Sequence, residues 1–532
     1  MTSAIVTENS ELALRVRQLE STNQHQQSRI HELEAQLNWF KEQFRLARHR
    51  EFGSSSEKID LQSELLFNEA EATLDSVPVE AEPETVTYVR KRKSVGHREE
   101  VLANLPIEVI EHRLGQDEQV CSQCGGPMHE MSTQVRDELV MIPAQAKVNR
   151  HVRYVYGCRH CDKHEINVPI VTAPGPAPLI PKSLASASAV AYVMSQKYVE
   201  AMPLYRIEKH FDRMGIELPR QVISNWVMKG GEMLEPIYDR MHELLLGLDI
   251  LHADETTLQV IREPGRRAQS KSCMWLYRSG RDGPPIVCYE YELGRDGKYA
   301  ARFLSGFAGF LHADGHAGYH DVEEATLVGC WAHARRKFFE ALLVVPEKLR
   351  DDPTLLGNIA IAKIKRLYEI EDELRGCSPE ERLSVRLRRS KPIVNQIKAW
   401  IEAESKLALP RSAIGSALTY CKNQWPKLIR FLDDGRLELD NNRAERSIKP
   451  FVIGRKNWLF ANTPKGAKTS AVIYSIVETA KENGLNPSSY LEYVFERLPK
   501  LDPADKPAID SLLPWSENVQ AALRIRRDNT QS

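Results

Sequence analysis

The tetrapeptide Leu-His-Ala-Asp occurs twice in this chain, ending at Asp254 and again at Asp314. Each copy follows an apolar run and has the pattern expected at the end of a buried strand. Between the two copies, residues 272–278 and 285–292 predict a hairpin, and residues 298–307 predict a helix. The chain therefore places an aspartate after its first and after its fourth predicted strand in this region.

A fifth strand is predicted at residues 325–331, followed by a second helix at residues 332–343. The order strand, strand, strand, helix, strand matches the ribonuclease H-like fold, in which the first and fourth strands lie side by side. The two aspartates would then share one metal ion. We expect a multidomain α+β chain with a ribonuclease H-like α/β catalytic core in residues 241–480.

A third carboxylate is predicted on a later helix, within the sequence Asp-Asn-Asn-Arg-Ala-Glu-Arg-Ser-Ile-Lys-Pro of residues 440–450. Asp440 or Asn441 can cap this helix, and Pro450 is expected to end it. Glu445 would then lie about one turn into the helix. A carboxylate on such a rigid element can complete the site that the strands begin.

Carboxylate oxygens are the ligands that Mg²⁺ and Mn²⁺ prefer in proteins. Two such ions, roughly 3.5–4 Å apart, can activate a water or a 3′ hydroxyl and stabilise the leaving oxygen of a phosphodiester. Asp254, Asp314 and Glu445 are therefore the predicted catalytic residues and the predicted ligands of two magnesium or manganese ions.

A basic tract follows Glu445: residues 446–468 contain six basic residues and no acidic one. Such a tract suits DNA phosphates that approach a carboxylate site. An aromatic side chain within it can stack on a base, although tryptophan is also common in protein cores. The predicted DNA-binding residues of this tract are Arg446, Lys449, Arg455, Lys456 and Trp458.

The span from Asp314 to Glu445 is much longer than one strand and one helix need. Residues 340–430 have a helical pattern throughout, and we interpret them as an insertion within the catalytic domain. Cys330 and His333 lie just before it. Because only two ligands are in view there, packing or DNA contact is favoured over metal binding for this pair.

Two C-x-x-C pairs predict a zinc ribbon in residues 96–172. Thiolates two residues apart can bind one ion from a tight turn, and two such turns complete a tetrahedral site with no open position. Redox pairing is the alternative. The predicted ligands of one structural zinc ion are Cys121, Cys124, Cys158 and Cys161.

Residues 1–50 predict a coiled coil, because apolar residues hold eight of the ten a and d positions over more than four heptads. We expect a homo-oligomer formed through this segment; an amphipathic helix docked on its own core is the alternative. Residues 51–95 include an acidic run, lack a sustained period and predict a linker.

Residues 173–240 predict a helical DNA-binding module. Residues 204–214, Gly215 and residues 221–228 have the pattern of a helix-turn-helix, with Gln221 and Asn225 exposed on the second helix. Two ordinary packed helices explain the same pattern equally well. Residues 481–532 predict a C-terminal helical element.

Bulk properties place the chain among globular proteins of several domains, with 532 residues and 27% charged residues. The N-terminus carries Glu8 and Glu11 without an apolar core, unlike a secretory signal. We expect a cytoplasmic protein with no membrane segment.

Several sequence motifs together resemble one family. They are the zipper ending near residues 52–58, the four-cysteine finger, His-Ala-Asp-Glu-Thr at 252–256, Asp-Gly-His-Ala-Gly-Tyr at 314–319, Gly-Cys-Trp-Ala-His-Ala-Arg-Arg-Lys-Phe at 329–338, Asp-Asn-Asn-Arg-Ala-Glu-Arg at 440–446, Gly-Arg-Lys-Asn-Trp-Leu-Phe at 454–460 and Asn-Pro-Ser-Ser-Tyr-Leu-Glu-Tyr at 486–493. Over nearly its whole length the chain resembles the transposases of the bacterial insertion-sequence family numbered sixty-six, also called TnpC-type. Ser54 and Ser55 depart from the pattern, since the family usually has basic residues there.

The resemblance implies a DNA transposase that binds the ends of its element, cleaves phosphodiester bonds and joins 3′ ends to target DNA. It assigns an Asp-Asp-Glu triad, which falls by motif on Asp254, Asp314 and Glu445. It also implies accessory proteins encoded by the same element, and a bacterial protein that is associated with the nucleoid when bound to DNA. Two alternatives stay open: a catalytically inactive DNA-binding regulator, and a structure-selective nuclease that cuts without joining.

The cysteine pairs generate a first prediction. A fragment of residues 100–171 should bind one zinc ion per chain by metal analysis, and Cys158→Ser should abolish that binding because it removes one of four thiolates. A metal-free fragment that is folded equally well would contradict the prediction.

Overall fold

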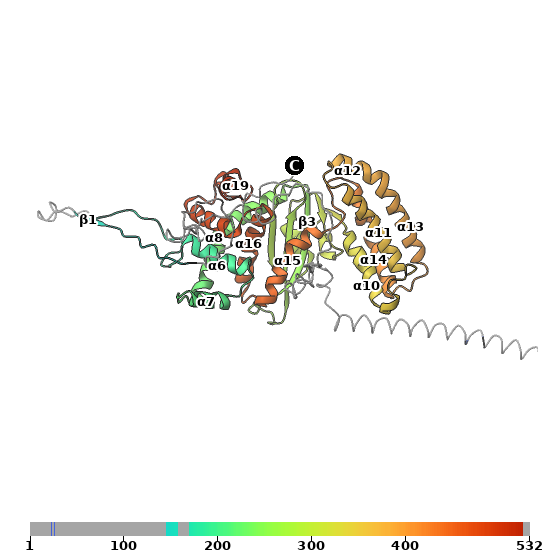
Figure 1. Ribbon diagram of the computed structural model, residues 1–532, viewed down its shortest axis with the longest axis horizontal. Helices are drawn as coiled ribbons and strands as arrows, with labels where there is room; N and C mark the ends of the chain where they lie inside the picture. Colours follow the sequence, from blue (N-terminus) through green and yellow to red (C-terminus); the bar gives the residue numbers. More distant parts are fainter. Residues whose placement is uncertain (1–22, 24–25, 27–144, 158–169, 525–532) are drawn as a thin grey trace, which may run out of the picture. The chain divides into compact units, whose positions relative to one another are not determined.

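The computed structural model describes Asn23, Gln26 and residues 145–157 and 170–524 (Figure 1). Asn23 and Gln26 are helical. The remainder of the predicted coiled coil, the linker of residues 51–95 and the four cysteines of the predicted zinc site lie outside the described residues. None of the described helices is long and apolar enough to cross a membrane.

A five-stranded sheet forms the centre of residues 149–524, in the order β5-β4-β3-β6-β7. Within this sheet, β4 pairs antiparallel with β3 and with β5. Strand β6 pairs in parallel with β3, and β7 pairs in parallel with β6. The first and fourth predicted strands therefore lie side by side, and the architecture is mixed α and β. The strands are β3 (Ile250–Gln259), β4 (Lys271–Ser279), β5 (Val287–Glu292), β6 (Phe310–His312) and β7 (Thr326–Val328).

Strand β3 is longer than the sequence pattern predicts, so Asp254 lies within the strand and not at its end. The reason is its pairing with β4, which continues from Asp254 opposite Leu276 to Gln259 opposite Lys271. Backbone hydrogen bonds to β4 hold the polar residues after Asp254 in the strand. The pattern of apolar residues in the sequence gives no sign of these bonds. The prediction of a strand ending at Asp254 was wrong, whereas β6 does end just before Asp314.

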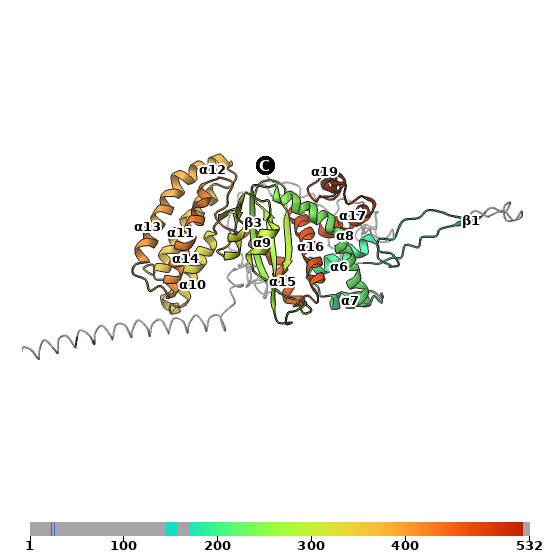
Figure 2. The same cartoon turned by 180° about the vertical axis from the view of Figure 1, so that it is seen from behind.

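Helices cover both edges of the sheet, which would otherwise expose unpaired backbone groups. At one edge, the hydroxyls of Ser475 and Thr479 on α16 (Pro464–Glu482) accept the backbone N–H groups of Tyr289 and Val287 of β5, at 2.8 and 3.0 Å. Just after β7, at the other edge, the Gly329 N–H donates to the carbonyl of Lys427 on α14 (Ala413–Leu428) at 3.0 Å. Figures 1 and 2 show α16 and the inserted helices on opposite sides of the sheet.

Helix α15 (Asn442–Trp458) packs against β3 and continues through Pro450, so the prediction that Pro450 ends it was wrong. A proline inside a helix costs about 3 kcal/mol because it removes a hydrogen bond and crowds the preceding turn. Ile448 and Phe451 are buried on either side of it. Burial of two such side chains stabilises by a comparable amount, about 1.5–3 kcal/mol each, which explains why the helix continues.

The expected helix-turn-helix corresponds to α7 (Leu204–Arg213) and the start of α8 (Arg220–Leu246), joined through Gly215 at φ +77°. Helix α8 is far longer than the eight residues that the sequence pattern predicts. It buries Ile223, Trp226 and Leu234 in the main core. Gln221 and Asn225 are exposed at its start, and DNA reading by them stays a prediction.

Other helices complete this side of the main core. Helix α6 (Ala187–Tyr198) packs against α8 and against α17 (Pro487–Arg497), and α18 (Lys506–Asp510) packs against α8. The last described helix is α19 (Glu517–Leu523). Ahead of them, β1 (Val155–Gly157) and β2 (Ile170–Thr172) pair antiparallel.

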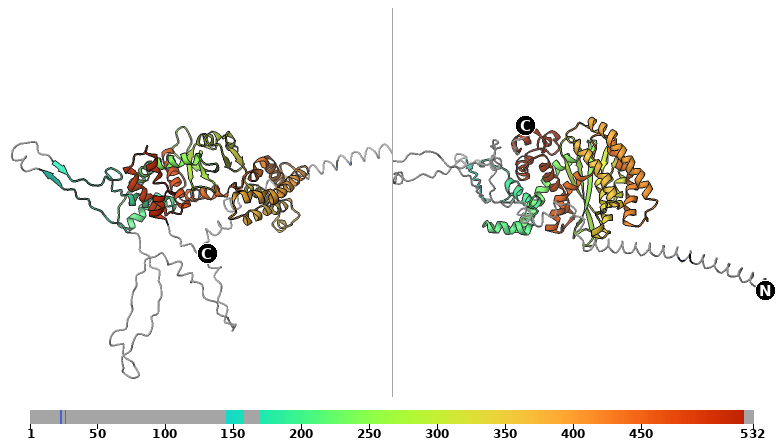
Figure 3. Two further views of the ribbon diagram at one scale, coloured as in Figure 1. Left: turned by 90° about the horizontal axis from the view of Figure 1, so that it is seen from above. Right: turned by 45° about the vertical axis from the view of Figure 1, so that its right-hand side comes forward.

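A group of helices, yellow to orange in Figure 3, is inserted between β7 and α15. These helices have a hydrophobic core of their own. Trp331, Phe338 and Leu367 lie in this second core. Arg386 is buried within it and binds both carboxylate oxygens of Glu371, at 2.8 and 2.7 Å. The inserted helices, besides α14, are α10 (Trp331–Leu343), α11 (Leu356–Glu373), α12 (Pro379–Val385), the π-helical η5 (Arg386–Ser390) and α13 (Lys391–Glu404).

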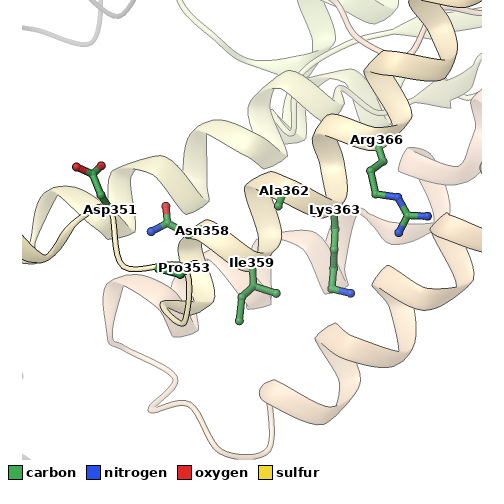
Figure 4. Close-up of a pocket in the computed structure, with 7 residues that line it drawn as sticks. All are labelled: Asp351, Pro353, Asn358, Ile359, Ala362, Lys363 and Arg366. Carbon is green, nitrogen blue, oxygen red and sulfur yellow. The ribbon is translucent and has the colours of Figure 1, made fainter.

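A surface hollow lies at the start of α11, with Lys363 and Arg366 on one of its walls (Figure 4). Asp351 lies at the opposite end of this group of side chains. All of its lining residues fall between positions 351 and 366, so the hollow contains no residue predicted to act in catalysis.

Candidate active site

Three structural elements bring together the three predicted catalytic carboxylates. Strands β3 and β6 pair in parallel with His252 opposite His312, so Asp254 and Asp314 each lie two residues beyond the last paired residues. Glu445 lies in the first turn of α15, which packs against β3. The repeated tetrapeptide therefore becomes two equivalent positions on adjacent strands, with the helix carboxylate beside them.

The carboxyl group of Asp254 interacts electrostatically with the neighbouring carboxylates. Burial raises the pKa of Asp254 well above its usual range, and the negative charges of Glu255, Glu445 and Asp314 raise it further. Each aspartate accepts one local backbone N–H: Glu255 N donates to Asp254 Oδ1 and His316 N to Asp314 Oδ1, both at 2.8 Å. One backbone bond to each does not offset this repulsion, whereas a bound cation would.

Glu255 is a neighbouring carboxylate to which the sequence pattern assigned no role. Consecutive strand residues point to opposite faces of the sheet, which places Glu255 on the other face from Asp254. Its oxygens are bound by Tyr319 Oη at 2.5 Å and Arg295 Nη2 at 2.9 Å. Burial and the charge of Asp314 raise the pKa of Glu255 to about 7. The motif His-Ala-Asp-Glu-Thr contains both Asp254 and Glu255. Only the alternation of side chains along the strand shows that the two carboxylates lie in different surroundings.

Glu445 faces two side chains of α10. Its Oε2 lies 3.3 Å from Nη2 of Arg336, and its Oε1 lies 3.5 Å from Nδ1 of His333. Oε1 and Nδ1 are both buried and make no hydrogen bond. Burial lowers the pKa of His333, which favours the neutral ring that binds metals.

The described residues include one cluster of at least three side chains that could bind a metal: Cys330, His333 and Glu445, whose ligand atoms lie within 4.8 Å of one another. Cys330 immediately precedes α10, and its thiol is buried. The sequence pattern favoured packing or DNA contact for Cys330 and His333, because Glu445 is more than a hundred residues away along the chain.

Asn441 joins the three elements of the site. Its side chain is 1% exposed; Oδ1 lies 2.9 Å from Nδ1 of His252, and Nδ2 donates to the carbonyl of Ala253 at 2.8 Å. Its backbone N–H donates to the sulfur of Cys330 at 3.2 Å. Although Asn441 is the N-cap residue of α15, its side chain makes no capping bond; Asp440 Oδ1 accepts the Asn442 N–H instead.

The histidines of the two repeats stack directly behind the aspartates. The rings of His252 and His312 lie 4.2 Å apart, nearly parallel at 6°, and neither is exposed. Burial lowers the pKa of His252 to about 4, so the ring is neutral at pH 7. These buried rings fix the spacing of the two strands two residues before Asp254 and Asp314.

Two other glutamates near Glu445 in the sequence, Glu438 and Glu478, have partners of their own. Glu438 binds Arg443 through both oxygens, at 3.0 and 2.8 Å, and also contacts His252. Glu478 is buried in α16, where it binds Lys481 at 2.8 Å. The carboxylates whose charges raise the pKa of Asp254 are instead Glu255, Glu445 and Asp314.

The predicted DNA-binding side chains of α15 fall into two groups. Arg446 and Lys456 are exposed, whereas Lys449, Arg455 and Trp458 are partly buried. Arg455 donates to Thr256 Oγ1 at 3.1 Å and to the carbonyl of Thr257, which ties it to β3. Trp458 packs edge-on against the buried ring of Phe451, at 5.5 Å. Both residues therefore have a structural role on the surface of the core.

Four protein-family models match this chain. The Transposase IS66 family model matches residues 182–469, and the model of the zinc-finger binding domain of transposase IS66 matches residues 118–162. The IS66 C-terminal element matches residues 475–515. A model described as Transposase C of IS166 homeodomain matches residues 39–110. The matches agree with the resemblance found in the sequence motifs.

Similar curated proteins come from Sinorhizobium fredii and are uncharacterized. The protein y4jD is 32% identical over 75% of this chain and 78% of its own length. The protein y4qI is 30% identical over 87% of this chain and 86% of its own length, and y4hP is 29% identical over 93% and 90%. The similarity therefore extends over most of each protein.

The contacts of Asn441 generate a prediction about stability. Asn441→Leu keeps the branched shape of the side chain but leaves His252 and the Ala253 carbonyl without their buried partner, at about 1–3 kcal/mol for each unsatisfied group. We expect the urea midpoint of the core transition to fall accordingly. The matched control is Asn442→Leu, which removes a side-chain bond to Asp440 at the partly exposed neighbouring position. Equal losses in the two variants would show that Asn441 does not join the elements.

Proposed function

The chain belongs to the IS66 family of transposases, and on that premise we propose that it binds the ends of an insertion sequence, cleaves phosphodiester bonds there and joins the 3′ ends to target DNA. The observation that carries the proposal is that the charges of Asp314 and Glu445 both act on the carboxyl group of Asp254. The strand order β5-β4-β3-β6-β7, with three antiparallel strands followed by two parallel ones, supports a ribonuclease H-like assignment for the core.

The donor set fits divalent metal ions. Asp254 and Asp314 offer carboxylate oxygens from adjacent strands, and Glu445 has a buried oxygen without a hydrogen-bond partner. Hard Mg²⁺ or Mn²⁺ ions prefer such ligands. When bound, two ions would supply activation of the attacking hydroxyl and stabilisation of the leaving oxygen. The chain's own part is to hold the carboxylates rigidly, through the β3–β6 ladder and the bonds of Asn441.

DNA is the proposed partner of several parts of the chain. Arg446 and Lys456 are exposed on the helix that carries Glu445, where they would contact phosphates near the scissile bond. Gln221 and Asn225 are exposed at the start of α8 and would contact DNA elsewhere. The zinc-finger match at residues 118–162 implies a zinc ion, and we propose Cys121, Cys124, Cys158 and Cys161 as its ligands.

Two further properties complete the proposal. Copies of the chain would associate through residues 1–50, and this association would bring two active sites to the two ends of one element. Accessory proteins encoded by the same element would assist. The intact set of three carboxylates favours an active enzyme over an inactive DNA-binding regulator. A strand-transfer assay with the element's own ends separates a transposase from a nuclease that cuts without joining.

The third carboxylate gives the sharpest test. Glu445→Gln removes a metal-binding charge with almost no change in volume, so the fold and DNA-end binding should survive. Cleavage and joining in Mg²⁺ should fall by several orders of magnitude, because the ions lose an anionic ligand. A gel assay of labelled element ends measures both reactions.

The matched control is Glu478→Gln, which neutralises a buried glutamate on α16 that binds only Lys481 among its described hydrogen-bond partners. This variant should retain most of the activity of the unmodified chain. An active Glu445→Gln beside an inactive Glu478→Gln would show that Glu445 is not the third ligand.

A further inference from the structure

We propose that His333 is a metal ligand of the same centre, binding through Nδ1 the ion that Glu445 binds through Oε1. The inference rests on the proposed function, because it adds a nitrogen donor to the carboxylate centre. It also replaces the interpretation, drawn from the sequence, that the Cys-x-x-His pair serves packing or DNA contact.

The first observation is the geometry of the two atoms. Nδ1 of His333 and Oε1 of Glu445 lie 3.5 Å apart, both buried, and neither has a hydrogen-bond partner. A buried polar atom without a hydrogen-bond partner is costly, and one cation bound by both atoms would satisfy the two at once. Ligands about 2.1 Å from one ion lie about 3.0 Å apart at right angles, as in an octahedral site, and about 3.4 Å apart in a tetrahedron. The separation of Nδ1 and Oε1 exceeds the octahedral value by about half an ångström, so a small turn of either side chain would let both atoms bind one ion.

The second observation is the position of His333 among the acidic residues. The negative charges of Glu445 and Asp314 both act on its ring. His333 therefore lies near two of the three proposed carboxylate ligands, and not only beside the helix carboxylate. It sits on the first turn of α10, while Cys330 just before that helix is tied to Asn441, so the ring is held on a fixed element.

Cys330 completes the cluster by distance but is poorly suited to bind the ion. Its sulfur already accepts the N–H of Asn441 at 3.2 Å. Thiolates select soft ions, whereas the oxygen donors of this centre suit Mg²⁺ and Mn²⁺. We assign Cys330 a positioning role: it fixes the start of α10 to the start of α15, and so fixes His333 relative to Glu445.

Arg336 supplies positive charge to Glu445 and leaves the proposed ligand atoms accessible. Its guanidinium lies 3.3 Å from Oε2 of Glu445 and 3.4 Å from Nε2 of His333, both long and weak contacts. Metal binding at Nδ1 would place the ring proton on Nε2. Because Nε2 and the Arg336 guanidinium would then both be donors, the Arg336 side chain would move away from His333. Because Arg336 is about one-third exposed, its side chain has room to turn toward DNA.

A nitrogen donor has a measurable consequence for metal selectivity. Imidazole is a better ligand for transition metals than for Mg²⁺, which is held almost entirely by oxygen. The centre should therefore prefer Mn²⁺ to Mg²⁺, and removal of the imidazole should weaken Mn²⁺ binding more than Mg²⁺ binding.

The experiment uses the purified full chain with Mn²⁺ alone as the probe. Electron spin-echo spectroscopy of bound Mn²⁺ should show modulation from a histidine ¹⁴N nucleus. His333→Gln should abolish that modulation and weaken Mn²⁺ binding by about tenfold or more. The matched control is His316→Gln: His316 follows Asp314 by two residues, but its Nδ1 already accepts the Gly318 N–H at 3.0 Å. The modulation should persist in this variant.

A second variant guards against a folding defect in His333→Gln. His333→Asn offers an amide oxygen close to the position of Nδ1, so it should bind Mn²⁺ with intermediate affinity and without the histidine signal. Circular dichroism confirms the fold of each variant. Unchanged Mn²⁺ affinity and an unchanged histidine signal in both folded variants would overturn the role of His333.

The outcomes separate this inference from the proposed function. Loss of Mn²⁺ binding in Glu445→Gln, with no nitrogen modulation in the unmodified chain, would leave the carboxylate centre intact and remove His333 from it. Mn²⁺ binding that is unaffected by Glu445→Gln and Asp254→Asn would contradict the carboxylate centre itself, and His333 with it. Loss of the modulation in His316→Gln alone would show that His316, and not His333, is the nitrogen ligand.

Discussion

Three residues of β3 pair in parallel with three residues of β6, and this short ladder determines the geometry of the whole site. Because the register sets His252 opposite His312, the two aspartates of the repeated tetrapeptide leave the ladder at the same level. A slip of one residue would turn one aspartate to the opposite face of the sheet and separate the pair. The stacked, fully buried rings of the two histidines oppose such a slip, since their packing depends on the same register.

A centre of this kind must hold like charges close together against their repulsion. The cost appears at Asp254, whose pKa is raised well above its usual range by burial and by three neighbouring carboxylates. The surrounding structure resists that repulsion with buried hydrogen bonds. Asn441 binds the strand of Asp254, contacts its histidine and donates to Cys330, which immediately precedes α10. The helix of Glu445 and the helix of His333 are therefore both positioned by one buried residue.

Much of this arrangement could be predicted from the sequence, because the signals were local. Apolar runs and turns indicated the strands in order, and the repeated Leu-His-Ala-Asp placed aspartates on two of them. The family models agree with the motifs quoted for the resemblance. The start of the helix near Asp440 was also evident, although the side chain of Asn441 binds His252 and Ala253 and makes no capping bond.

The features that were missed depend on contacts between distant segments. Pro450 ends a helix by local rules, yet α15 continues because Ile448 and Phe451 are buried against the core. The pairing of β3 beyond Asp254 depends on β4, which no apolar pattern in residues 255–259 reveals. His333 and Glu445 are far apart in the sequence and lie side by side only in the folded structure. The C-x-x-H pair supplies two possible ligands that are close in sequence. The third, Glu445, comes close to them only in the folded structure.

The assignment of Asp254, Asp314 and Glu445 as metal ligands can be examined by anomalous diffraction from crystals of the full chain grown with Mn²⁺. We predict a manganese peak bonded to carboxylate oxygens of Asp254 and Asp314, with Glu445 as a ligand of an ion in the same centre. Manganese bound elsewhere on the chain, with these three side chains retaining their present contacts at saturating Mn²⁺, would contradict the assignment.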